Sequence, residues 1–104
     1  MKAEDKYINI AKNTVLDLIN RETTSVFLFG SRAENANADD SDLDIGFLSN
    51  KKIDVLLFHK IREALENSIV PYHIDLVDFY NADDEFSKIA TDNILIWNKA
   101  KNFN

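Results

Sequence analysis

The chain of 104 residues contains no cysteine, so it can form neither a disulfide bond nor a thiolate metal site. It also lacks any apolar run near the roughly 20 residues that a membrane-spanning helix needs. Its first residues are charged and lead into no apolar segment, which argues against a secretory signal peptide. These absences predict a protein of the reducing cytoplasm that has no contact with membranes.

Basic residues are also scarce: 12 Lys and Arg stand against 18 Asp and Glu, for a formal net charge of −6. Binding to nucleic-acid phosphates without sequence preference requires a basic surface, so we expect no direct nucleic-acid binding. An acidic chain is better suited to a basic protein partner. The length predicts a single domain over residues 1–104, with no second domain to recognise an acceptor.

Apolar residues at helical spacing predict helices over residues 4–20 and 52–69. The apolar stripe of the second helix consists of Ile53, Leu56, Leu57, Ile61, Leu65 and Ile69. Asn81 and the acids after it are typical of a helix N-terminus, and this last helix would bury Phe86 and Ile89.

β-Branched and aromatic runs predict three strands, over residues 23–29, 42–48 and 72–79. Residues 94–97 are too apolar for a free tail and form either a closing strand or a contact surface. Strands separated by helices indicate an α/β fold in which a small, mostly parallel or mixed sheet has helices packed against it.

A phosphate cradle is predicted where the first strand ends in Gly30-Ser31. Gly30 has no Cβ, so a phosphate can come close to the backbone. The Ser31 hydroxyl and the amides of a following helix can then donate hydrogen bonds to phosphate oxygens.

A carboxylate cluster is predicted across two strands. Asp42 and Asp44 are two residues apart, so both project from one face of their strand, away from Leu43 and its apolar neighbours. Asp75 lies mid-strand, where a charge is unfavourable without a partner or a metal. If the two strands pair, three carboxylates meet and can hold one or two Mg²⁺ ions beside the phosphates of a substrate.

These residues also have simpler interpretations. The acidic segment 39–44 alone is compatible with a solvated loop, and Asp75 with an ion-paired strand residue. An EF-hand fails because Ile45 would stand where that loop needs glycine. Asp78 lies on the opposite face from Asp75, which indicates a structural carboxylate. His73 has no ligand spacing and receives no role.

Gly30-Ser31, ten further residues and then Asp42-Leu43-Asp44 resemble the signature of the DNA polymerase β-type nucleotidyltransferase superfamily. More closely, the chain resembles the minimal nucleotidyltransferases (MNT) that act as antitoxins beside HEPN toxins. The resemblance covers nearly the whole chain and implies the polymerase beta-like nucleotidyltransferase fold.

The resemblance implies a role for each matching residue. Asp42, Asp44 and Asp75 would be the catalytic carboxylates and metal ligands, with ATP as the substrate. Gly30 and Ser31 would hold the triphosphate, and Arg32 would either assist them or pair with a surface acid. The implied partner is a HEPN ribonuclease whose tyrosine hydroxyl accepts AMP, in a homo- or hetero-oligomer.

Two other functions remain open from the sequence. The chain could be a binding module that neutralises its partner by covering it, with the carboxylates unused. It could also transfer the nucleotidyl group to a small molecule, although relatives of that kind usually have an extra helical region.

Overall fold

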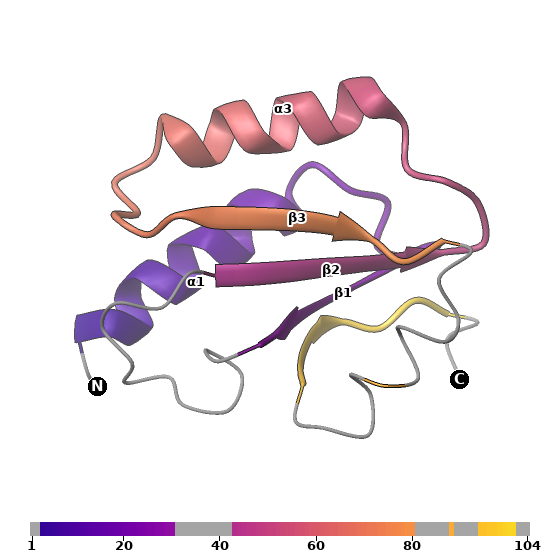
Figure 1. Cartoon of the computed structure of the whole chain (residues 1–104), viewed down its shortest axis with the longest axis horizontal. Helices are drawn as coiled ribbons and strands as arrows, with labels where there is room; N and C mark the ends of the chain where they lie inside the picture. Colours follow the sequence, from indigo (N-terminus) through magenta and orange to yellow (C-terminus); the bar gives the residue numbers. More distant parts are fainter. Residues whose placement is uncertain (1–2, 31–42, 81–87, 89–93, 102–104) are drawn as a thin grey trace.

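The architecture is a four-stranded sheet covered by helices, as seen in a computed structural model of the chain (Figure 1). The structure describes residues 3–30, 43–80, 88 and 94–101. Within these ranges, the elements follow in the order α1 (Ala3–Leu16), β1 (Thr24–Phe29), β2 (Leu43–Ser49), α3 (Val55–Glu66), β3 (Ile74–Asp78) and β4 (Leu95–Asn98).

The sheet is mixed, and its strand order is β3-β2-β1-β4. β1 pairs antiparallel with both β2 and β4, whereas β2 pairs parallel with β3. Two parallel neighbours cannot be joined by a tight turn, and α3 supplies the crossover between them. The predicted α/β class with a small mixed sheet is therefore confirmed.

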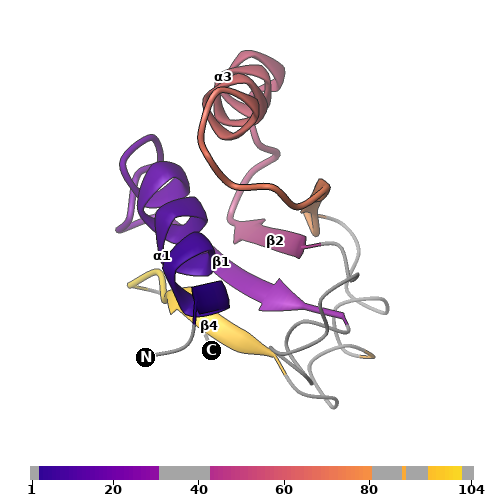
Figure 2. The ribbon, with the colours of Figure 1, turned by 90° about the vertical axis from the view of Figure 1, so that its left-hand side faces the viewer.

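Both helices lie on the same side of the sheet (Figure 2). Alternate strand residues point toward them and form the core with the inner faces of α1 and α3. The fully buried members of this core are Ala11, Val15, Val26, Leu28, Leu43, Ile45, Phe47 and Ile61. Each of these side chains larger than alanine contributes about 1.5–3 kcal/mol by leaving water, so this face is a main source of the stability of the fold.

The second predicted helix corresponds to α3, which is shorter than the predicted range 52–69. The predicted apolar stripe of this helix is also partly wrong. Asp54 is the N-cap, and its side chain accepts a hydrogen bond from the Leu56 amide at 2.8 Å. The face that buries Ile61 and Leu65 therefore leaves Leu56 on the other side of the helix, 71% exposed. Ile69, which is 65% exposed, lies beyond the helix end.

Residues 94–97 were expected to be either a strand or a contact surface, and most of them form the edge strand β4. Its position is held by the Asn98 side chain, which donates to the carbonyl oxygens of Arg21 and Thr24 at 2.8 and 2.7 Å. Trp97 packs against the core, while Ile96 stays 47% exposed. The last predicted helix, with Phe86 and Ile89, lies outside the described residues.

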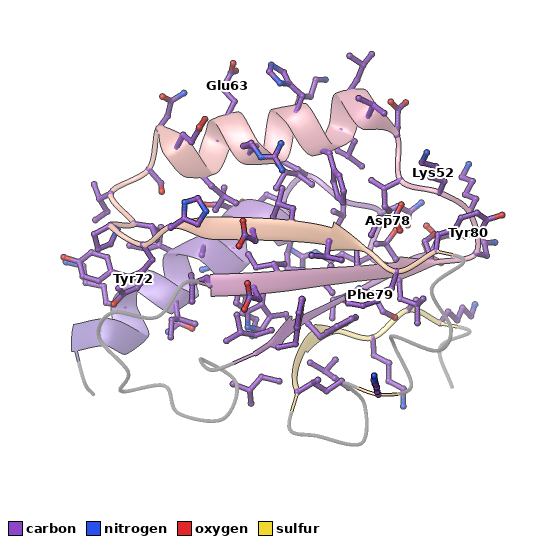
Figure 3. All side chains as sticks on the ribbon, viewed as in Figure 1. Lys52, Glu63, Tyr72, Asp78, Phe79 and Tyr80 are labelled. Carbon is purple, nitrogen blue, oxygen red and sulfur yellow. The ribbon has the colours of Figure 1, made fainter. Side chains whose placement is uncertain are left out.

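Asp78 connects the end of β3 to the start of α3 (Figure 3). Its Oδ2 accepts a hydrogen bond from the Ile53 amide at 2.9 Å, and its Oδ1 accepts one from the Tyr80 amide at 3.0 Å. This agrees with the structural role expected for Asp78. Within the described residues, neither helix is long and apolar enough to cross a membrane.

Replacing Asp78 with alanine is expected to lower the free energy of unfolding by about 1–3 kcal/mol, because two backbone amides lose their acceptor. Asp78→Asn keeps one oxygen acceptor and should lose less. Urea unfolding followed by circular dichroism measures both variants. Wild-type stability for Asp78→Ala would show that these hydrogen bonds do not hold the connection.

Candidate active site

The parallel pairing of β2 with β3 places two of the predicted carboxylates side by side. Asp44 and Asp75 are register partners, in strands that lie about 4.8 Å apart in a sheet. Both project from the sheet face opposite the helices, because Leu43 and Ile45 beside Asp44 are buried in the core, and Ile74 and Leu76 beside Asp75 pack against it. Asp44 is half-buried, whereas the Asp75 side chain is 52% exposed.

Gly30 contacts the carboxylate of Asp44 from the β1 side. Its φ is +77°, a left-handed conformation that favours glycine, and a Cβ added there would overlap Oδ2 of Asp44. Phe29, the residue before it, is the register partner of Asp44. The site therefore crosses three strands in the order Gly30, Asp44, Asp75.

The other predicted site residues, Ser31, Arg32 and Asp42, lie outside the described residues. Within the described ranges, no group of three acidic, histidine or cysteine side chains could hold a metal ion. Asp44 and Asp75 alone offer adjacent carboxylate oxygens on one face, which is the kind of ligand that Mg²⁺ prefers. The described donor set thus fits a hard divalent cation.

An aromatic cluster formed by Phe27, Phe29 and Phe79 lies on the same face. The ring centroids of Phe79 are 5.5 Å from Phe27 and 5.4 Å from Phe29. A Cβ at Gly46 would overlap the Phe27 ring, so this glycine makes room for the cluster. The two carboxylates consequently stand beside a packed apolar surface.

His73 contacts Asp75, and sequence reasoning missed this contact. The ring nitrogen Nε2 lies 3.2 Å from Oδ1 of Asp75, and the histidine carbonyl accepts a hydrogen bond from the Leu43 amide at 2.9 Å. The clue was available, because residues two apart on a strand share a face. Metal-ligand spacing alone does not detect such a pair.

A hollow of about 400 Å³ borders Asp75 on the outer side of β3. One wall is the C-terminal half of α3, and the other is β3 with the residues that lead into it. The residues lining it are Arg62, Leu65, Glu66, Val70, Tyr72, His73, Ile74, Asp75 and Leu76.

Residues 8–102 match the family model described as "Polymerase beta, Nucleotidyltransferase". The chain belongs to this nucleotidyltransferase family. The match spans β1, β2 and β3, and with them Gly30, Asp44 and Asp75. The family predicted from the Gly-Ser and Asp-x-Asp motifs is confirmed.

Among related nucleotidyltransferases, the chain is 32% identical over 65 residues to a probable protein adenylyltransferase, MntA, from Haemophilus influenzae. The aligned region covers 62% of this chain and 57% of that relative, so the chain spans little more than half the relative's length.

Two solved structures share the fold. The first, of a tri-AMPylated Shewanella oneidensis HEPN toxin in complex with an MNT antitoxin, matches at a TM-score of 0.57 and 20% identity over 86% of this chain and 70% of that chain. The second, of a toxin–antitoxin with AMP-PNP, matches at a TM-score of 0.58 and 24% identity over 92% of this chain and 73% of that chain.

Replacing Gly30 with alanine is expected to weaken Mg-ATP binding at least tenfold, because the new Cβ would displace the Asp44 carboxylate. The substitution should also lower the free energy of unfolding by about 1–2 kcal/mol, because alanine disfavours the left-handed conformation. Calorimetry with a non-hydrolysable ATP analogue measures the affinity, and urea unfolding measures the stability.

Gly30→Asn separates these two effects, since asparagine tolerates the left-handed conformation but still carries a Cβ. It should therefore be more stable than Gly30→Ala and bind equally weakly. Wild-type affinity in both variants would show that Gly30 does not control the position of Asp44.

Proposed function

We propose that this nucleotidyltransferase transfers AMP from Mg-ATP to a tyrosine hydroxyl of a HEPN toxin and thereby acts as an antitoxin. The observation that carries the proposal is the register of β2 and β3, which pairs Asp44 with Asp75 beside Gly30. The adenylyl group and the HEPN acceptor are supported by the MntA relative and by the structural likeness to MNT–HEPN complexes.

The proposed substrate position follows the order of residues across the sheet. Gly30, at the β1 side of the site, would hold the triphosphate together with Ser31 and Arg32. Asp42, Asp44 and Asp75 would hold one or two Mg²⁺ ions, which would neutralise negative charge on the reacting phosphates and the departing pyrophosphate. We infer a cytoplasmic location, where ATP for the reaction is abundant.

In the transfer step, the acceptor hydroxyl oxygen bonds to the α-phosphorus of ATP. The bond between that phosphorus and the bridging oxygen to the β-phosphate breaks, and pyrophosphate leaves with the electron pair. The proton of the acceptor hydroxyl passes to the Asp75 carboxylate. The acceptor can reach this carboxylate because the Asp75 side chain is half-exposed. Asp75 then returns the proton to solvent.

The acidity of the chain supports a protein acceptor. A net charge of −6 is complementary to a basic RNA-binding protein, and complementary charge accelerates association. A catalytic antitoxin also needs less than one copy for each toxin molecule, because each copy turns over.

The central test mixes this chain with a tenfold molar excess of a HEPN acceptor protein, in the presence of ATP and Mg²⁺. Intact-mass spectrometry should show that all the HEPN protein gains whole AMP units. Asp44→Ala should abolish the gain. Neutralisation only at matched stoichiometry, without a mass change, would instead establish a non-catalytic binding module.

Asp75→Asn is expected to retain Mg-ATP binding but to slow transfer about 10²-fold or more, as for loss of a general base. Asp78→Asn is the matched control, since Asp78 lies on the same strand but is bonded to backbone amides. Single-turnover rates measured by mass spectrometry compare the two. Equal rates would reduce Asp75 to a structural residue.

A further inference from the structure

The hollow beyond β3 lies on the side of Asp75 that faces away from Asp44 and Gly30. In the order β3-β2-β1-β4, β3 is the outermost strand of the described sheet on this side (Figure 1). Asp75 lines the hollow and is also the register partner of Asp44. The hollow and the candidate active site therefore share the residue Asp75.

The outer edge of β3 presents backbone groups to this hollow. Toward β2, the His73 carbonyl accepts from the Leu43 amide at 2.9 Å, and the Phe79 amide donates to the Phe47 carbonyl at 2.8 Å. Backbone groups of alternate residues in a parallel strand point to opposite sides. The amides and carbonyls of Ile74 and Leu76 thus point outward, where no strand of the described residues pairs with them.

The chemistry of transfer requires an acceptor on this side. The attacking oxygen and the leaving oxygen lie roughly in line on opposite sides of the phosphorus. With the triphosphate at Gly30, on the β1 side of Asp44, the acceptor must approach from beyond Asp75. The outer edge of β3, which the hollow borders, lies on that side.

The walls of the hollow do not favour a second phosphate group. They carry one cation and one anion from α3, Arg62 and Glu66, next to the apolar side chains of Leu65 and Val70. With Asp75, the lining has two carboxylates against one arginine, which repels a further anion. Its apolar area and the outward backbone groups suit an extended peptide, which adds to a sheet edge through main-chain hydrogen bonds.

We propose that the acceptor protein lays an extended segment along the outer edge of β3, bonded to the backbone of Ile74 and Leu76. Alternate side chains of this segment point toward α3 and fill the hollow. The others point to the face of Asp75, where the hydroxyl-bearing side chain meets the carboxylate. This inference rests on the proposed function, since it requires a protein acceptor.

A single thiol tests the hollow directly, because the chain has no cysteine of its own. Glu66→Cys is labelled with a bulky maleimide to block the hollow. Glu63→Cys carries the same label on the same helix, where the Glu63 side chain is 68% exposed and points away from the sheet (Figure 3).

Label at position 66 should raise the KM for the HEPN acceptor at least tenfold and leave the affinity for Mg-ATP unchanged. Label at position 63 should change neither. Equal acceptor KM values for the two labelled proteins would overturn the docking site while the proposed function stands. Absence of transfer by the unmodified protein would overturn the proposed function itself, and this inference with it.

Amide hydrogen exchange tests the backbone pairing independently. In the free protein, the amides of Ile74 and Leu76 should exchange faster than that of Asp75, which faces β2. Addition of the HEPN protein to Asp44→Ala, which cannot transfer, should slow exchange at Ile74 and Leu76. Unchanged exchange at both amides in the complex would contradict docking along this edge.

Discussion

The parallel pairing of β2 with β3 is the interaction on which the site depends. A backbone hydrogen bond holds the pairing at each end. At one end the Leu43 amide donates to the His73 carbonyl, and at the other the Phe79 amide donates to the Phe47 carbonyl. Between these ends, Asp44 and Asp75 are partners. A slip of one residue would turn Asp75 toward the core and bring an apolar side chain beside Asp44. The core prevents that slip, because Ile74 and Leu76 pack against its buried cluster.

The two faces of the sheet thus have different roles: one packs the core, and the other carries the residues of the proposed site. The helix face buries aliphatic side chains, and the core they form tolerates no charge. The opposite face carries two neighbouring carboxylates whose mutual repulsion a bound cation would relieve. The glycines permit this arrangement, since Gly30 lets the backbone approach Asp44 and Gly46 gives space to the ring of Phe27. The proposed site therefore lies on the face opposite the helices, beside the aromatic cluster.

Much of the fold and of the candidate site was predictable from the spacing of residues along the sequence. Alternation along residues 42–48 identified the face of Asp44, and the Gly-Ser and Asp-x-Asp spacing indicated the family. The outward position of Leu56 was missed because it depends on where the Asp54 cap starts α3. The hollow beyond β3 was missed because it depends on strand order, which joins residues distant in sequence. The pattern of residues within one segment does not indicate which strand lies at the edge of the sheet.

The central claim is that the paired carboxylates of β2 and β3 form the metal site of a nucleotidyltransferase. Crystals of the protein with Mn²⁺ and a non-hydrolysable ATP analogue test it most directly, through the anomalous scattering of the metal. The account predicts a metal peak within bonding distance of carboxylate oxygens from Asp44 and Asp75, next to the analogue's phosphates. Metal peaks and phosphates bound elsewhere, with this pair left without a cation, would contradict it.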